Sequence, residues 1–70
     1  MSTFPAILAT LRKSKGLTQN ELSRLLGLAP STVSMYENGR REPNFEVLEA
    51  LADFFNVDMN YLVAMPAFSA

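Results

Sequence analysis

The sequence predicts an all-α fold, a compact arrangement of five short helices, and two observations support this prediction. Apolar residues recur at spacings of three and four along most of the chain, which is the period of a helix with one buried face. No stretch alternates apolar and polar residues as a half-buried strand would. Glycines, prolines and capping residues divide the periodic stretches, so we expect short helices joined by tight turns.

The first two helices are predicted at Thr3–Lys15 and Thr18–Leu26. Thr3 is the expected cap of the first helix, and Pro5 lies in its first turn, where a missing N–H costs nothing. Thr18 and Glu21 form the T-x-x-E pattern of a capping box at the start of the second helix. Each helix has a predicted buried face, made of Phe4, Ile7, Leu8 and Leu11 in the first and of Leu22, Leu25 and Leu26 in the second.

A third helix, Pro30–Asn38, follows after only a few residues. Gly27 tolerates the positive φ that often ends a helix, and proline is favoured where the next helix begins. Val33 and Tyr36 are three apart and are expected to face inward. A small residue, Ser23, stands where the two helices should approach closely. The residues predicted to lie on the outer side of this helix are Ser31, Thr32, Ser34 and Met35.

Two more helices are predicted in the last third of the chain. Asn44 caps the fourth, which runs to Phe55, and Asn56 suits the turn after it. Asp58 caps a short fifth helix, Met59–Val63. We assign residues 1–64 to one domain and residues 65–70, which lack any periodicity, to a tail or the start of a linker.

Composition narrows the function classes. The chain of 70 residues contains no Cys and no His, which excludes disulfides, the usual zinc sites and catalytic triads that need either residue. No metal or cofactor is therefore expected. The absence of disulfides fits a reducing cytoplasm, and no apolar run approaches the ~18 residues that a membrane span needs.

The net charge of −1 conceals an uneven distribution. Residues 1–41 hold all six basic residues against two acids, a charge of +4, whereas residues 42–70 hold five acids and no basic residue. A basic half of this kind suits a nucleic-acid partner, because phosphates respond to the local field rather than to net charge. Charge alone fits ordinary solvated surface equally well. The polar, uncharged outer side of the third helix adds weight to the first interpretation, since such a helix can read base edges in the major groove.

With these features, the chain resembles the phage-repressor and Cro type of helix-turn-helix domain, the Xre family. The matching stretch is Leu11 to Val63, and it contains RKSKGLTQ, the turn LLGL, the segment YENGRREP and the closing NVDMNYL in that order. The resemblance implies a lambda-repressor-like fold. It also implies a transcriptional regulator, repression of a near-palindromic operator in double-stranded DNA, and action as a homodimer with the third helix in the major groove.

Site residues follow from the resemblance position by position. Arg12 and Glu37 are expected to form an ion pair that joins the first helix to the end of the third. The third helix of this chain lacks the Gln or Arg that grips a base at two points, so we expect direct readout to be thin. The expected base contacts are Pro30, Ser31, Thr32, Ser34 and Met35, and the expected phosphate contacts are Gln19, Asn38, Arg40 and Arg41.

A protein-interaction module and an enzyme are the alternatives to this function. The same fold serves in antitoxins, and Phe45 beside Glu46 and Glu49 offers a docking face for a protein partner. The sequence is also consistent with the DNA-binding part of a longer repressor, in which an additional C-terminal domain would supply dimerisation or ligand sensing. An enzyme is rejected, because no phosphate loop and no carboxylate pair in an apolar setting is visible.

Overall fold

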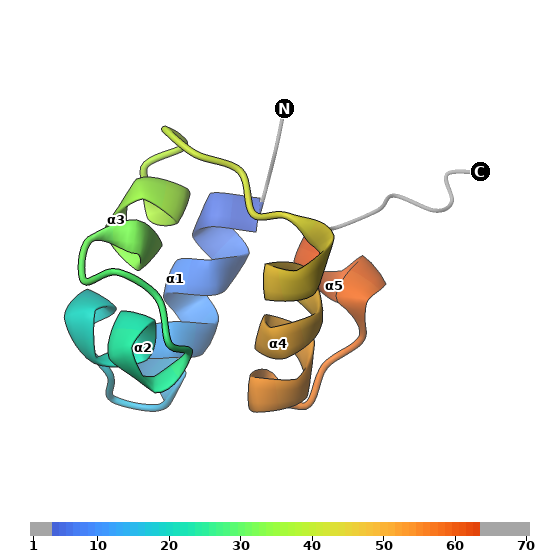
Figure 1. Ribbon diagram of the computed structural model, residues 1–70. Helices are drawn as coiled ribbons and strands as arrows, with labels where there is room; N and C mark the ends of the chain where they lie inside the picture. The colour runs from blue at the N-terminus through green and yellow to red at the C-terminus, as the bar shows by residue number, and fades with distance from the viewer. Residues whose placement is uncertain (1–3, 64–70) are drawn as a thin grey trace.

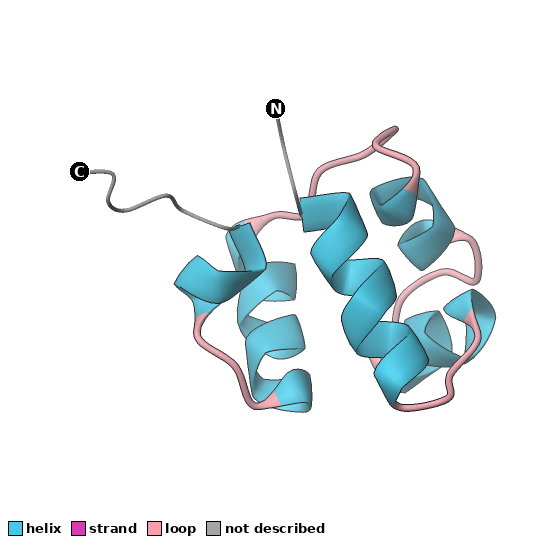
Figure 2. Ribbon diagram, turned by 180° about the vertical axis from the view of Figure 1, so that it is seen from behind, coloured by secondary structure: helices cyan, strands magenta, loops and turns pink. Residues whose placement is uncertain are grey.

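The computed structural model describes residues 4–63, which form five helices. Figure 1 shows α2 and α3 side by side at one end of the molecule, α4 and α5 at the other, and α1 between the two pairs. Figure 2 shows the same order from behind, with only loops between the helices. The predicted all-α fold is confirmed. The helices are α1 (Phe4–Ser14), α2 (Gln19–Leu25), α3 (Thr32–Glu37), α4 (Phe45–Phe55) and α5 (Met59–Val63).

The core lies where these helices meet. Leu8, Leu22, Leu51 and Leu62 come from four different helices, and each is fully buried. Phe4 of α1 meets Tyr36 of α3 edge to face, with ring centroids 6.1 Å apart. These contacts fix α3 against α1. Because α3 is too short to be stable alone, its packing against the core holds its exposed surface in place. The remaining buried apolar side chains are Val33, Ala52 and Phe55.

The predicted helix starts are confirmed at three caps. Thr18 Oγ1 accepts the Glu21 N–H at 3.0 Å, and Glu21 Oε1 accepts the Thr18 N–H at 2.8 Å, which completes the capping box. Asn44 accepts the Val47 N–H at the start of α4. Asp58 accepts the Asn60 N–H before α5. The predicted cap Thr3, the domain boundary at 64 and the tail lie outside the described residues.

The turn between α2 and α3 is closed by backbone hydrogen bonds. Leu28 N–H donates to Ser23 C=O at 2.8 Å and Gly27 N–H donates to Arg24 C=O at 3.0 Å, the two bonds of a Schellman motif. Gly27 has φ +73°, as its place after a helix predicts. Asn56 plays the same part after α4 with φ +57°, a conformation that asparagine tolerates better than most residues do.

Two expectations about these helices are wrong. Helix α3 begins at Thr32 rather than Pro30, because Pro30 and Ser31 form a turn that the Thr32 N–H closes on Ala29 C=O. Leu25, expected to be buried, is 60% exposed. The buried face of α2 is made of Leu22, Ser23 and Leu26. Successive residues of a helix are rotated by about 100°, so Leu25 lies outside this face.

Candidate nucleic-acid interface

Helices α2 and α3 are joined through a buried serine. Ser23 is 0% exposed, and its Oγ accepts the Val33 N–H at 3.1 Å. Val33 lies in the first turn of α3, where backbone N–H groups lack a partner within the helix. The expected packing role of Ser23 is therefore confirmed, and Ser23 also provides a hydrogen bond that fixes the start of α3 against α2.

The outer surface of α3 differs from the prediction at one residue. Pro30, Ser31 and Met35 are exposed and Ser34 is half-buried. Thr32, expected on the outer side, is only 5% exposed. It precedes Tyr36 by four residues and so shares the buried face of α3. The prediction for Thr32 is wrong because the spacing of Val33 and Tyr36 alone does not define the full width of the buried face.

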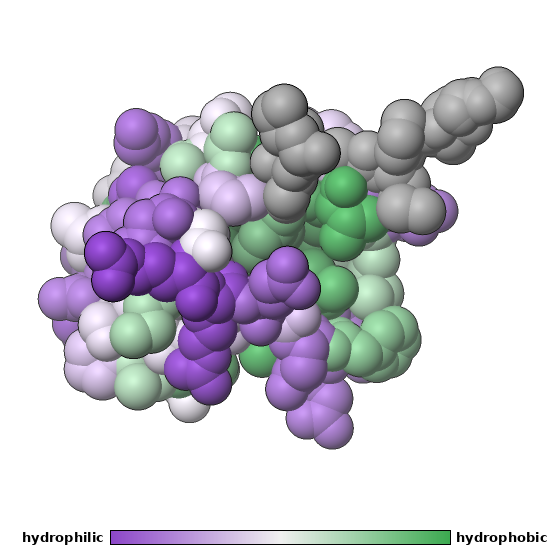
Figure 3. All heavy atoms as spheres, turned by 90° about the horizontal axis from the view of Figure 1, so that it is seen from above, coloured by the Kyte–Doolittle hydropathy of each residue, from purple (hydrophilic) through white to green (hydrophobic). Residues whose placement is uncertain are grey.

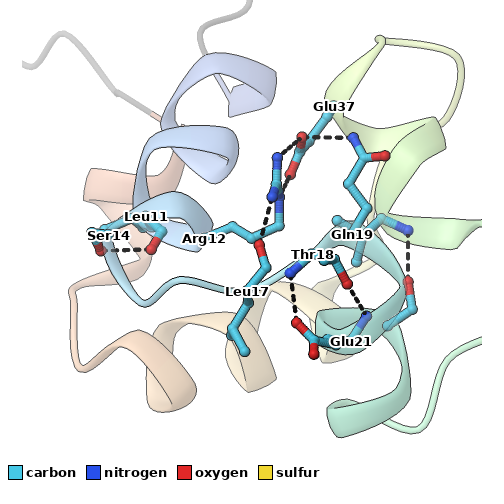
Figure 4. Close-up of polar contacts among 10 residues, drawn as sticks. Leu11, Arg12, Ser14, Leu17, Thr18, Gln19, Glu21 and Glu37 are labelled. Atoms are coloured by element: carbon cyan, nitrogen blue, oxygen red, sulfur yellow. Dashed lines mark hydrogen bonds and ion pairs between the residues drawn. The ribbon is translucent and has the colours of Figure 1, made fainter.

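The expected ion pair between Arg12 and Glu37 is present (Figure 4). Arg12 Nε donates to Glu37 Oε2 at 2.7 Å, and Arg12 Nη2 donates to Glu37 Oε1 at 3.0 Å. Nη1 of the same guanidinium donates to Leu17 C=O at 2.6 Å. The two side chains are only 10% and 8% exposed, and the hydrogen bonds that Arg12 donates to Glu37 raise the pKa of Arg12 above its ordinary value. The pair thus joins α1, the α1–α2 loop and the end of α3.

Gln19 belongs to the same cluster, which sequence reasoning missed. Its Nε2 donates to Glu37 Oε1 at 2.9 Å, so the first residue of α2 is tied to the last residue of α3 (Figure 4). The two residues are 18 apart, and no spacing rule connects them. The Gln19 side chain, predicted to contact a phosphate, is therefore already bound to Glu37 in the free protein.

The connector after α3, residues 38–44, carries the other predicted phosphate contacts. Arg40 and Arg41 are exposed there. Asn38 is exposed as well, and its Oδ1 accepts the Arg40 N–H at 3.0 Å. The side chain of Asn38 therefore stabilises the turn. Its contact with a phosphate stays a prediction, as do those of the two arginines.

The charge asymmetry of the sequence becomes an asymmetry in space. In the described part of the chain the exposed cations lie on α1, α2 and the loops that flank α2 and α3, whereas Glu46, Glu49 and Asp53 are exposed on α4. In Figure 3, seen from above, strongly hydrophilic side chains gather toward the side that holds α2 and α3, and apolar side chains gather toward the other side. Arg12 adds no free charge, because Glu37 neutralises it. The exposed cations are Lys13, Lys15, Arg24, Arg40 and Arg41.

The other features to consider within residues 4–63 are a catalytic cleft, a metal site and a membrane-spanning helix. A cleft of about 210 Å³ is lined by Phe4, Glu42, Pro43, Leu48 and Val63, and a single carboxylate stands among apolar side chains there. No group of three or more potential metal ligands occurs within that range. None of its helices is long and apolar enough to cross a bilayer.

Comparison with known proteins agrees with this geometry. The family model described as "Helix-turn-helix" matches residues 8–62. The HTH-type transcriptional regulator AnsR of Bacillus subtilis is 41% identical over 56 residues, which cover 80% of this chain and 48% of AnsR. The ImmF control region 10 kDa protein of Bacillus phage phi105 is 37% identical over 57 residues, which cover 81% of this chain and 63% of that protein.

A solved structure shares the fold. The SOS-response transcriptional repressor LexA from Eubacterium rectale superposes with a TM-score of 0.79 at 28% sequence identity, over 86% of this chain and 64% of that one. The chain thus spans about half to two thirds of the length of these relatives. By its matching family model, its relatives and its five-helix fold, this chain belongs to the phage-repressor and Cro-type, or Xre, family of helix-turn-helix domains.

Proposed function

We propose that this chain is the DNA-binding domain of a transcriptional regulator and that it lays α3 in the major groove of double-stranded DNA. The observation that carries the proposal is the hydrogen bond between Ser23 and Val33, which joins α2 to α3. The outer surface of α3 is polar apart from Met35 and lies between exposed cations. A major groove admits one helix, and the first residues of such a helix reach the base edges.

Base readout by this surface is thin. The buried side chain of Thr32 cannot reach a base. The proposed base contacts are Pro30, Ser31, Ser34 and Met35. Serine hydroxyls donate and accept, so they discriminate weakly between bases, and the Met35 side chain suits a thymine methyl. The rest of the recognition comes from the shape of the DNA and from phosphate contacts. The proposed phosphate contacts are Gln19, Asn38, Arg40 and Arg41.

The regulator acts as a homodimer on a near-palindromic operator, and it represses transcription. One domain covers one half-site, so two half-sites lie about one helical turn, ~34 Å, apart. On α5, Tyr61 is 53% exposed and Met59 and Val63 are half-buried, which leaves apolar surface for a second copy. In the sequence, Met65 and Phe68 are further apolar candidates for this contact, and both lie outside the described residues. Repression is supported by the likeness to LexA, an SOS-response transcriptional repressor.

Selection of bound duplexes from a random pool at about 100 mM salt tests the proposal. We expect an inverted repeat with half-sites one turn apart. A single, unrepeated half-site would support DNA binding and contradict the dimer. No enrichment over the starting pool would contradict DNA binding by the chain.

Two substitutions on α3 test which residues read bases. Ser34→Ala and Met35→Ala are expected to change the selected sequence while the protein stays folded, because both side chains reach the outer surface. Glu49→Gln on α4 is the matched control and should select the wild-type sequence. Identical selected sequences from all four proteins would place base readout elsewhere.

A protein-interaction module is the second candidate, favoured by one surface. Phe45 is 66% exposed at the start of α4, beside the exposed Glu46 and Glu49. An exposed aromatic ring among acids suits a basic partner, as in the antitoxin interpretation or in contact with a further domain. Phe45→Ala should then abolish a copurifying complex while it leaves the selected DNA sequence unchanged.

A further inference from the structure

Glu37 accepts one hydrogen bond in addition to the two from its ion-pair partner Arg12. Its Oε2 accepts from Arg12 Nε, and its Oε1 accepts from both Arg12 Nη2 and Gln19 Nε2. A carboxylate at this position therefore holds two side chains at once, one from α1 and one from α2. The Glu37 side chain is only 8% exposed.

The charge of Glu37 decides which way the Gln19 amide points. An ionised carboxylate only accepts hydrogen bonds, so the amide must turn its Nε2 toward Glu37 and its Oε1 away, as Figure 4 shows. The Nε2 group has two N–H bonds, and the hydrogen bond to Glu37 uses one of them. Within residues 4–63 the Gln19 side chain makes no other hydrogen bond. One amide N–H is thereby kept available in a fixed direction.

We propose that Glu37 is a positioning residue for DNA binding, which holds the Gln19 amide so that its second N–H donates to a backbone phosphate. Phosphate oxygens only accept, so a phosphate contact needs an N–H, and the opposite amide orientation would place Oε1 where Nε2 now lies and remove the donor from that position. Holding the side chain before DNA arrives also removes the entropy loss of ordering it on binding. Arg12 supports this arrangement indirectly, because it neutralises a carboxylate that would otherwise repel DNA.

This inference rests on the proposed function, and a double-mutant cycle tests it. Gln19→Ala is compared in the wild-type chain and in an Arg12→Met, Glu37→Met background, where apolar side chains replace the ion pair and the amide loses its anchor. Affinity for the selected duplex is measured in each protein. We expect the loss of affinity caused by Gln19→Ala to be about twofold to tenfold smaller in the methionine background, the range expected for ordering one long side chain.

Asn20→Ala supplies the matched control, since Asn20 is the next residue of α2, is exposed and makes no side-chain hydrogen bond to Glu37 within residues 4–63. It should cost the same affinity in both backgrounds. Equal losses for Gln19→Ala in both backgrounds would overturn the positioning role while the proposed function stands. Failure of the wild-type chain to bind any duplex would overturn both.

A second measurement uses the wild-type protein alone and stays decisive if the methionine variant does not fold. In nuclear magnetic resonance spectra of the free protein, the Gln19 side-chain amide proton that bonds Glu37 should exchange with water more slowly than the side-chain amide protons of Asn20. On addition of the duplex, the Gln19 signals should shift. Equal exchange rates for the two amides would show that Glu37 does not hold Gln19 and would overturn the proposal.

Discussion

Single residues decide how firmly the candidate interface is built, and Arg12 is the first example. Its guanidinium uses Nε, Nη1 and Nη2 to hold Glu37 and the Leu17 carbonyl. Both charged side chains are about nine-tenths buried. A buried pair contributes little net stability compared with an apolar pair, yet each partner depends on the other, because a lone buried charge is costly.

Arg12→Ala should therefore lower the free energy of unfolding by about 3–5 kcal/mol, since it leaves Glu37 buried without its cation. Urea denaturation at pH 7 measures this loss. Lys13→Ala, one residue further and exposed, is the control and should change stability by at most about 0.5 kcal/mol. A loss below about 1 kcal/mol for Arg12→Ala would mean that the pair is solvated like a surface salt bridge.

Ser23 is the second residue on which the interface depends. Ser23→Ala removes the acceptor of the Val33 N–H in a buried site, so we expect a loss of about 1–3 kcal/mol in the free energy of unfolding. Ser14→Ala is the matched control, because Ser14 Oγ also bonds a backbone group, the Leu11 carbonyl, but does so in an exposed position. Similar losses for the two variants would contradict a special role for the buried hydrogen bond.

At the scale of the element, short helices depend on their ends. Helix α2 has seven residues and α3 has six, too few to be stable alone in water. The capping box at Thr18 and Glu21 and the Schellman turn at Gly27 satisfy backbone groups at both ends of α2. These local motifs explain why the sequence predicts α2 more accurately than α3, whose cap Ser31 makes no side-chain hydrogen bond.

The capping box gives α2 a pH dependence with a defined sign. The hydrogen bond from the Thr18 backbone N–H, with smaller help from the Thr18 hydroxyl and Arg24, lowers the pKa of Glu21. A carboxyl whose pKa is lower in the folded state stabilises the fold above its ordinary pKa, about 4.3, and this stabilisation is lost as pH falls through the lowered value.

Glu21→Gln should thus be less stable than the wild type at pH 6, and the difference should shrink as the pH falls below about 4. Thermal unfolding from pH 6 to pH 2.5 measures the difference. Glu49→Gln, whose carboxylate accepts no hydrogen bond among the described residues, is the control. A difference that stays constant over this range would show that the charge of Glu21 does not stabilise the cap.

At the scale of the whole molecule, two halves of opposite charge share one core. Helix α1 lies between the α2–α3 pair and the α4–α5 pair, so it joins the candidate DNA surface to the acidic end (Figure 1). A chain with a net charge of −1 can in this way direct a basic surface toward DNA while its acidic surface faces away. The salt dependence of binding should then depend on the free cations alone.

Arg40→Ala should weaken binding to all sequences alike and reduce the slope of log affinity against log salt by about 1, because one phosphate contact is lost. Fluorescence anisotropy between about 50 and 200 mM salt measures the slope. Glu49→Gln, on the acidic end, should leave the slope unchanged. A change in the preferred sequence for Arg40→Ala would instead make Arg40 a base-reading residue.

The sequence by itself determined what depends on neighbours along the chain. Residue types predicted the caps and left-handed turns correctly, because each of these motifs closes within a few residues. The caps are at Thr18, Asn44 and Asp58, and the turns are at Gly27 and Asn56. The family resemblance added the pair of Arg12 and Glu37. The base and phosphate contacts remain predictions, since they involve a molecule that is not part of this chain.

Only the tertiary structure decided which face each short helix turns to the core. Leu25 is exposed and Thr32 is buried because α2 and α3 meet at Ser23, and a helix of six or seven residues has too few apolar positions to define its buried face alone. The contact of Gln19 with Glu37 arises in the same way. It joins residues far apart in sequence, and such a contact exists only after the helices have packed.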